Sequence, residues 1–470
     1  MASLLRKCFK RKSNRKANER VYDKSEYDES YAPTKKVLGW VAIRMTHSIS
    51  EQTTKWWDMF YWFEMMNLFL AGPSELVSMV TTAYEAQTFR DSIKVFRMMP
   101  CFGCVVLSMF KSINMVIHRP VFENLATEMR DMWPEGELTD EEHQIIKAAL
   151  KELNLIVKGY YWCNNALLIS FLSPPYFITI ARYCGYDSPM GLHFLYWLPF
   201  DPYQPVYYEV TLVVQTWHAL VVIWFNVAWD MLFCLFLCHI TTQFDLLARR
   251  VTRLFYVTVD QQLVRSYPMA AVSEEMLRTE GEQVKSTSDT NWESKHQKQI
   301  TEIVLRHHSL IRLTGDVEKM FSLALLINFM NSSIIICFCG FCCVLIEEWN
   351  EVAYKSFLVT ALTQTWLLCW YGQKLIDSSK RLADALYDCA WYNGSNRARS
   401  AVLIMLHRAQ KGIYVTTHGF SVISLASYST VSVGFAILLL FSNDLKSQSI
   451  SHKLEGVHGS IQSTSNQQLK

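Results

Sequence analysis

The chain has 470 residues, half of them hydrophobic, and its formal net charge at pH 7 is only +2. A soluble protein of this length would divide into two or three domains joined by polar linkers, whereas here the apolar residues gather in long blocks. The small net charge argues against nucleic acid as a partner, and the apolar blocks imply that the chain contacts membrane lipids.

Seven apolar blocks are long enough to cross a bilayer, which takes roughly 20 predominantly apolar residues. The sequence therefore predicts an all-α membrane protein with seven transmembrane helices in a domain at 56–442. The last block begins with an amphipathic piece near 399–411 and continues as one uncharged run. The predicted spans are residues 57–80, 95–117, 154–181, 207–240, 320–346, 356–376 and 399–442.

The connections between these blocks differ sharply in basic residues. One side would hold residues 1–57, 118–152, 243–317 and 374–399, with 32 Lys and Arg, and the other side would hold 6. Cytoplasmic loops collect Lys and Arg, so we predict an inverted topology, with the amino terminus in the cytosol and the carboxyl terminus outside. Residues 1–55 then form a basic cytosolic segment, and residues 443–470 form a polar extracellular tail.

Motifs for catalysis or metal binding find little support in the sequence. Two Cys-x-x-Cys pairs, at Cys101 and Cys104 and at Cys339 and Cys342, lie within apolar blocks without a nearby histidine. Buried cysteines of this kind pack as small hydrophobic residues. A Gly-rich phosphate loop, a nucleophile elbow and an HExxH motif are all missing. We therefore expect no enzyme activity, cofactor or metal.

Charged residues inside the predicted spans are more informative, because each is costly in a membrane and usually has a partner. Glu64 and Lys111 lie at matching depths in the first and second spans, so an ion pair between them is geometrically feasible. The alternative is that Lys111 extends to the headgroups. Asp230 and His239 lie towards the inner end of the fourth span, where they could bond across helices or line water.

Several segments resemble the insect odorant receptor family. Residues 197–217, WLPFDPYQPVYYEVTLVVQTW, are similar to the family's outer loop before the fourth helix. The segment 370–392 resembles the exit of its sixth helix, and LIMLHRAQKG (403–412) with SLASYS (424–429) resembles its seventh. Within this family, the segments at 403–412 and 424–429 most resemble the pheromone receptors of moths. The longer basic amino-terminal segment and the tail after Asn443 depart from the family pattern.

The resemblance implies an olfactory, pheromone-type receptor that binds a small, volatile, apolar ligand. Its pocket would lie among the second, third, fourth and sixth spans. Such a pocket is mainly apolar and aromatic, with one or two polar groups. The outer halves of these spans contribute the predicted ligand-binding residues, which are Phe96, Met99, Phe171, Phe177, Val214, Trp217, Phe357, Thr360 and Gln364. For each of them, ordinary packing between helices is the alternative.

The resemblance also implies a heterotetrameric, odorant-gated cation channel formed with the odorant receptor co-receptor, in the dendritic membrane of olfactory neurons. The family anchors its subunits through cytosolic helices, which here carry the aromatic residues Tyr387, Trp391 and Tyr392. The family's pore is lined by the outer half of the seventh helix. The co-receptor's motif there aligns Tyr428 and Phe435 with its aromatic positions and Val431 with the gate.

Three other functions fit the sequence less well than an odorant-gated channel. A G-protein-coupled receptor would have its amino terminus outside, which the loop charges disfavour. A gustatory receptor of the same superfamily would not explain the WLPFDPY loop and the SLASYS segment. A secondary transporter usually shows inverted repeats and broken helices, and neither is visible in the sequence.

The topology can be tested with epitope tags. A tag after Lys470 should be labelled on intact cells, whereas a tag before Met1 should be labelled only after permeabilisation, because the basic loops hold the amino terminus in the cytosol. Antibody labelling of intact and permeabilised cells makes the measurement. The reverse pattern would refute the inverted topology.

Overall fold

The computed structural model describes residues 21–22, 24–41, 51–87, 89–134, 136–186, 190–204, 206–254, 274–345, 352–434 and 436–437. Two-residue strands β1 (Val21–Tyr22) and β2 (Gly136–Glu137) pair antiparallel, and another helix begins at residue 425. The other described helices are α2 (Ser25–Ser30), α3 (Ala32–Trp40), α4 (Glu51–Glu85), α5 (Phe89–Ile117), α6 (Arg119–Asp131), α7 (Asp140–Tyr183), α8 (Tyr207–Thr252), α10 (Glu274–Leu345), α11 (Val352–Asp388), the 3-10 turn η2 (Trp391–Asn393) and α12 (Asn396–Ala409).

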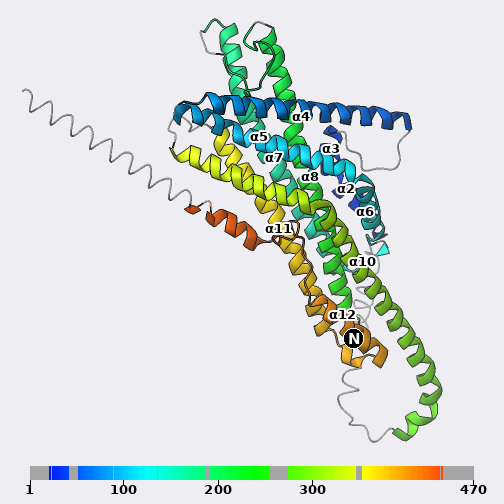
Figure 1. The fold of residues 1–470 in the computed structure, drawn as a ribbon. Coiled ribbons are helices and arrows are strands. Elements are labelled where there is room, and N and C mark those ends of the chain that lie inside the picture. The colour runs from blue at the N-terminus through cyan, green and yellow to red at the C-terminus, as the bar shows by residue number, and fades with distance from the viewer. Residues whose placement is uncertain are drawn as a thin grey trace, which may run out of the picture.

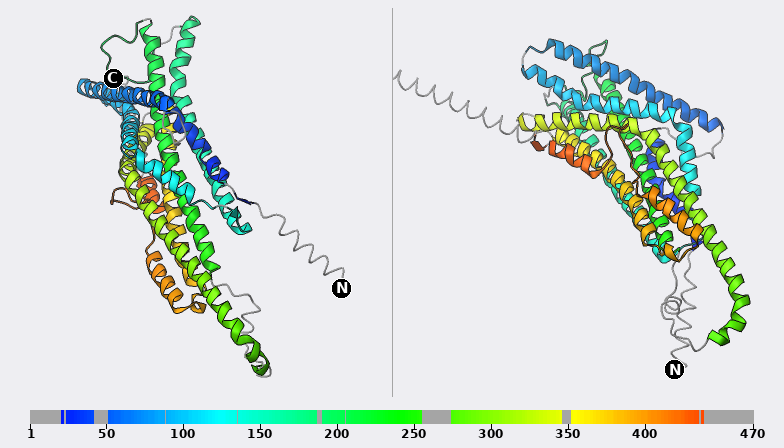
Figure 2. Two further views of the ribbon diagram at one scale, coloured as in Figure 1. Left: turned by 90° about the vertical axis from the view of Figure 1, so that its right-hand side faces the viewer. Right: turned by 60° about the horizontal axis from the view of Figure 1, so that its bottom comes forward.

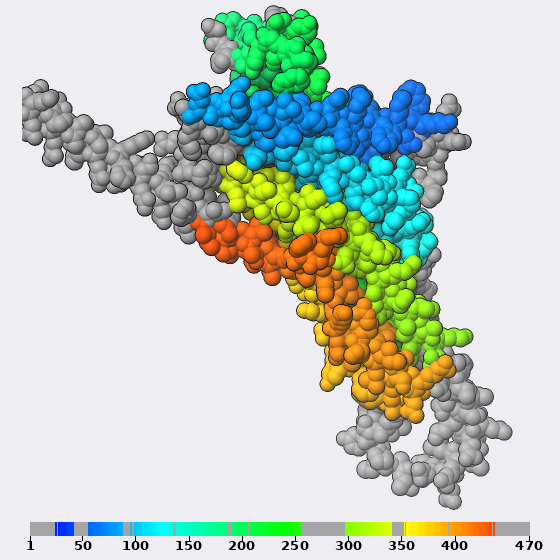
Figure 3. Space-filling model, in the orientation of Figure 1, coloured from blue at the N-terminus to red at the C-terminus, as the bar shows by residue number. Residues whose placement is uncertain are grey.

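Helix α8 forms the centre of the molecule. Every residue from 225 to 244 is buried, and α8 packs against α3, α4, α5, α7, α10 and α11. A helix that is apolar around its whole circumference needs such enclosure. Figures 1 and 2 show α7 and α8 running side by side and emerging together beyond α4. In Figure 3, α4, α5 and α10 form one face of the molecule and hide most of α8.

Three segments within the described residues are long and apolar enough to span a membrane by length and composition alone. They are Met98–Ile117 in α5, Tyr207–Thr252 in α8 and Gln297–Gly340 in α10. Helix α10 also extends well before the predicted fifth span, since it begins at Glu274. Much of the long polar stretch between the fourth and fifth spans is therefore helical and continuous with the span that follows it.

A buried ion pair joins α5 to α8. The Lys111 ammonium donates to Asp230 Oδ1 at 2.8 Å, and both side chains are 1% exposed. Oδ2 of the same carboxylate accepts from the Tyr160 hydroxyl of α7 at 2.8 Å and from the Gln364 amide of α11 at 2.6 Å. These four residues will be called the Asp230 cluster. They connect four helices through one carboxylate.

Neither interpretation of Lys111 from the sequence holds, because its partner does not come from α4 and its side chain is buried rather than extended to the headgroups. Glu64 is buried, and neither of its carboxylate oxygens has a hydrogen-bond partner among the described residues. Similar depth along two neighbouring spans is not enough for an ion pair, since the two side chains must also face each other. Both α4 and α8 pack against α5, but of Glu64 and Asp230 only Asp230 directs its carboxylate at Lys111.

His239, which the sequence analysis named together with Asp230, bonds across helices. Its Nε2 lies 3.1 Å from the Ser30 hydroxyl of α2. The rings of Tyr27, Tyr31 and Trp133 surround it, with centroids 4.6, 5.3 and 4.9 Å away. Helix α2 and the chain just after α6 therefore pack onto the same end of α8, and α3 continues from there towards Trp224, whose ring lies 4.9 Å from that of Trp40.

The seventh apolar block was predicted as one span at 399–442, but it is not one continuous helix. Helix α12 ends at Ala409, residues 411–424 form an extended turn in which Thr416 bridges to Val422, and a helix resumes at residue 425. The break follows from the β-branched residues Ile413, Val415, Thr416 and Thr417 and from Gly419, which has a positive φ of 81°. An uncharged run in the sequence predicts that a segment is buried, but it does not predict that the whole segment is helical.

This extended segment packs tightly on α11. A Cβ placed on Gly372 would lie 2.4 Å from the carbonyl oxygen of Ile423, so only glycine fits where the two backbones meet. The Glu318 carboxylate of α10 accepts from the Thr416 backbone amide at 3.2 Å and from its hydroxyl at 2.5 Å. The segment before the last helix is therefore held between α10 and α11.

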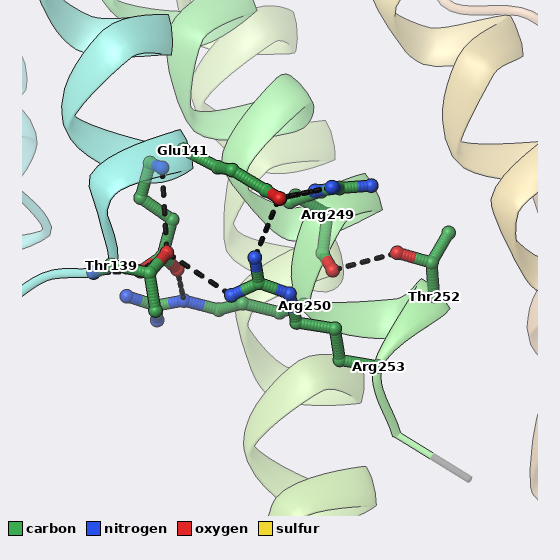
Figure 4. A network of polar contacts seen from close by, with 7 residues as sticks. Thr139, Glu141, Arg249, Arg250, Thr252 and Arg253 are labelled. Carbon is green, nitrogen blue, oxygen red and sulfur yellow. Dashed lines mark hydrogen bonds and ion pairs between the residues drawn. The ribbon is translucent and has the colours of Figure 1, made fainter. Parts of the chain in front are cut away.

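The predicted cytosolic ends of α7 and α8 are joined by charged residues (Figure 4). Helix α7 begins with a capping box, in which the side chains of Thr139 and Glu142 accept from each other's backbone amides. Arg249 of α8 bonds Glu141, and Arg250 bonds Glu142 at 3.0 Å. The hydrogen bond from Arg249 holds the pKa of the Glu141 carboxyl below its usual range. These contacts fix the register of the two helices at this end.

The Asp230 cluster predicts a large effect of removing Lys111. Lys111→Met should lower the free energy of unfolding by about 3–5 kcal/mol, because it leaves a buried carboxylate without its counter-charge. Arg130→Met is a matched control, since it breaks the half-exposed Arg130–Asp28 pair (2.8 Å) and should cost no more than about 1 kcal/mol.

The measurement is the thermal unfolding midpoint of each purified variant in lipid nanodiscs. The double variant Lys111→Met, Asp230→Asn should recover part of the loss, because it removes the unpaired charge. Equal midpoints for Lys111→Met and Arg130→Met would show that the buried pair does not hold the helices together.

Candidate ligand-binding cavities

A small apolar cavity lies among α5, α7, α8 and α11, and it will be called the inner cavity. Its volume is ≈ 30 Å³. Apart from two cysteine thiols and one imidazole, its wall consists of aliphatic and aromatic side chains. The lining residues are Cys101, Cys104, Val105, Leu167, Leu168, Phe171, Phe194, His218, Ala219, Val222, Ile223 and Phe357. A wall of this kind suits a small apolar ligand.

Three phenylalanines meet on one side of the inner cavity. The ring of Phe171 packs edge-on against Phe357, with centroids 5.6 Å apart at 89°, and lies 5.3 Å from Phe194. They come from α7, α11 and the connection between α7 and α8. Each ring can rotate about its two side-chain torsions without moving the backbone. Rotation of these rings would therefore change the volume of the cavity.

A second cavity of ≈ 260 Å³ adjoins the first and will be called the outer cavity. It shares Cys101, Phe171 and Phe194 with the inner cavity and also includes Glu75, which is 1% exposed. Ligand pockets start at about 300 Å³, so the inner cavity is too small by itself. Movement of the shared side chains would join the two spaces into a volume close to that limit.

Hydrogen bonds from Gln215 hold the connection between α7 and α8 beside these cavities. The buried Gln215 amide oxygen accepts from the backbone amides of His193 and Phe194 at 3.0 and 3.2 Å, and its nitrogen donates to the Phe194 carbonyl at 2.9 Å. Burial lowers the pKa of His193 to about 4, so this residue is neutral at ordinary pH. Gln215 thus fixes the position of Phe194 in the cavity wall.

His218 is the most polar group in the wall of the inner cavity. It is 1% exposed, and neither ring nitrogen has a hydrogen-bond partner among the described residues. Its ring lies edge-on to Phe194 and Tyr196, with centroids 6.1 and 5.9 Å away. Most buried polar groups in proteins are hydrogen-bonded, so an unpaired imidazole beside a cavity points to a ligand.

The nine ligand-binding residues predicted from the sequence do not form one site. Phe171 and Phe357 line the inner cavity, and Thr360 lies one turn further along α11, where its hydroxyl is 3.6 Å from the Cys163 thiol. Gln364 belongs to the Asp230 cluster instead. Met99 is half-buried and lines neither cavity, and the side chain of Phe96 lies outside the described part of the chain.

The remaining three face away from the cavities. Phe177 and Val214 are 69% and 54% exposed, and Trp217 lines a separate groove with Trp40, Trp56 and Trp224. One position along a helix turns a side chain by about 100°. His218, the residue after Trp217, lines the inner cavity, and Gln215, the residue after Val214, bonds the backbone of Phe194 in the cavity wall.

The other predicted sites also divide by exposure. Tyr387 and Tyr392 are 70% and 62% exposed, whereas Trp391 is half-buried. In the last helix, Tyr428 and Val431 are half-buried against the core. Phe435 lies outside the described residues.

Comparison with known proteins identifies the family. The family model described as "7tm Odorant receptor" matches residues 92–434. The chain belongs to the odorant receptor family. Odorant receptor 85c of Drosophila melanogaster is 23% identical over 403 residues, which cover 83% of this chain and 93% of that protein. Odorant receptor 67c of the same species is 25% identical, and the match covers 78% of this chain and 83% of the relative.

Solved structures agree with this assignment. The insect olfactory receptor OR5 of Machilis hrabei superposes with a TM-score of 0.70 at 13% identity, over 90% of this receptor and 99% of that chain. Its complex with eugenol gives 0.71 at 12% identity, over 90% of this receptor and all of that chain. The seven-transmembrane, all-α fold predicted from the sequence is therefore confirmed. The odorant receptor family consists of membrane receptors, so the chain is not an enzyme.

The cavities predict different effects for two phenylalanines of the same helix. Phe171→Ala should shift the half-maximal odorant concentration by roughly fivefold or more, as expected for a contact worth over about 1 kcal/mol. Phe177→Ala, six residues further along α7 and exposed, is the matched control and should leave it unchanged. Dose–response curves for several odorants, at equal surface expression, measure the effect. A shift for Phe177→Ala alone would place the pocket elsewhere.

Proposed function

We propose that this receptor is the ligand-binding subunit of an odorant-gated, non-selective cation channel formed with the odorant receptor co-receptor. Its ligand would be a small, volatile, apolar molecule of pheromone type. It would act in the cell membrane of olfactory neuron dendrites. The observation that carries the proposal is the cavity pair lined by Phe171, Phe194 and Phe357, in a chain of the odorant receptor family.

The contacts of α11 suggest how a ligand would act on the channel. Phe357 lines the inner cavity, and two turns further on Gln364 donates to Asp230. Beyond it, Gly372 meets the segment that leads into the last helix. A ligand that displaces Phe357 could thus move α11 against that segment. It opens the channel only if it binds the open state more tightly than the closed state.

The last helix is our proposed pore lining, with Tyr428, Val431 and Phe435 on one face and Val431 at the constriction. Hydrophobic constrictions gate by dewetting. Val431→Ser should therefore raise the current recorded without odorant, and an unchanged basal current would remove Val431 from the gate.

The contact with the co-receptor is proposed to include Tyr387, Trp391 and Tyr392. Aromatic residues are enriched in interface cores, and the exposure of Tyr387 and Tyr392 supports their availability. Trp391→Ala should reduce co-precipitation with the co-receptor, and full co-precipitation would argue against the interface.

Co-expression tests the function directly. Cells that express the receptor together with the co-receptor should show inward cation currents when a panel of volatile odorants and pheromone-type compounds is applied. Cells that express either subunit alone supply the matched controls, and the receptor alone should give no current. Current carried equally well without the co-receptor, or a response that requires G-protein activation, would contradict the proposal.

A further inference from the structure

We propose that His218 is the hydrogen-bonding residue of the inner cavity and that it selects apolar volatiles carrying an oxygen function, such as an alcohol, an aldehyde or a ketone. This inference rests on the proposed function. It adds a ligand class and a specificity-determining residue that family membership does not supply.

The wall of the inner cavity has few polar groups. The lining of the inner cavity is aliphatic and aromatic except for the thiols of Cys101 and Cys104 and the imidazole of His218. A thiol is only a weak hydrogen-bond donor, whereas a neutral imidazole offers one N–H donor and one strong acceptor. Within the inner cavity, His218 is therefore the side chain that can form a strong hydrogen bond with a ligand, and the part of the ligand that enters this cavity must otherwise be apolar.

The imidazole of His218 is buried, and neither ring nitrogen has a hydrogen-bond partner within the described part of the chain. Its neighbours Phe194 and Tyr196 approach with their rings, at 6.1 and 5.9 Å between centroids. Fold stability does not account for a histidine here, because an apolar residue of similar size would pack in this place without an unsatisfied polar group.

The ring of Tyr196, which lines neither cavity, lies 5.9 Å from the ring of His218 and carries a second buried polar group. The Tyr196 hydroxyl is buried and has no partner among the described residues, and its ring stacks on Phe194 at 5.5 Å with 7° between the planes. Gln215, one turn before His218, holds the backbone of Phe194. The polar end of a ligand is therefore expected beside α8 and the connection at 190–197, with its apolar part towards Phe171 and Phe357.

The test uses four eight-carbon probes, which are 1-octanol, octanal, 2-octanone and octane, on cells that express the receptor with the co-receptor. The parent should respond to at least one oxygenated probe at a lower half-maximal concentration than to octane. His218→Phe should reduce this preference by about three- to tenfold, the loss of one neutral hydrogen bond. His218→Gln, which keeps a donor and an acceptor, should retain most of it.

The readout is the ratio of two half-maximal concentrations on the same cells, so receptor abundance cancels. Val213→Phe is the matched control, because Val213 lies on α8 with a 62% exposed side chain and the change should leave the ratio unaltered. If His218→Phe does not reach the surface, His218→Met makes the same comparison with a flexible apolar side chain.

Two results would overturn the inference while the proposed function stands. One is a parent that responds to other odorants but does not prefer any oxygenated probe over octane. The other is an unchanged ratio in the apolar His218 variant that reaches the surface. A parent that gives no current with any odorant, with the co-receptor present, would instead refute the proposed function and this inference with it.

Discussion

The buried pair of Lys111 and Asp230 is the constraint on which the arrangement of the helices depends. Burying two charges costs several kcal/mol for each ion, and this cost is offset only if both are paired and further hydrogen bonds satisfy the carboxylate. Tyr160 and Gln364 provide those bonds from two other helices. A rotation or a slide of any one of the four helices would leave a charge or a polar group unpaired, so the cluster fixes their mutual register.

That register also determines where the ligand cavity lies. In each of the four helices, a residue of the Asp230 cluster is separated by seven positions, or about two turns, from a residue that lines the inner cavity. The pairs are Lys111 and Cys104, Tyr160 and Leu167, Asp230 and Ile223, and Gln364 and Phe357. Seven residues span about 10 Å of helix. The cavity therefore lies one layer away from the cluster on all four helices.

Much of the fold follows from the sequence, because apolar length and loop charge are local signals that survive at 23% identity between family members. The partner of Lys111 could not be found in this way, since facing side chains depend on how α5 packs against α8. The broken seventh block was missed although its β-branched residues at 413–417 and Gly419 were visible. For the site, Phe171 and Phe357 were predicted and line the inner cavity, whereas Trp217 lies in a separate groove and the neighbouring His218 lines the cavity, because which side of α8 faces the cavity depends on how the helices pack.

The neutrality of the Asp230 cluster has an electrical consequence. Moving one elementary charge across the whole membrane at a potential of 100 mV involves about 2.3 kcal/mol of electrical work. Lys111 and Asp230 bond directly at 2.8 Å, so a movement of α5 and α8 that keeps them together carries opposite charges through the same field. The work of the two charges cancels. This pair therefore moves no net charge through the field when α5 and α8 move together, so the resting potential of the cell neither favours nor opposes that movement through the pair.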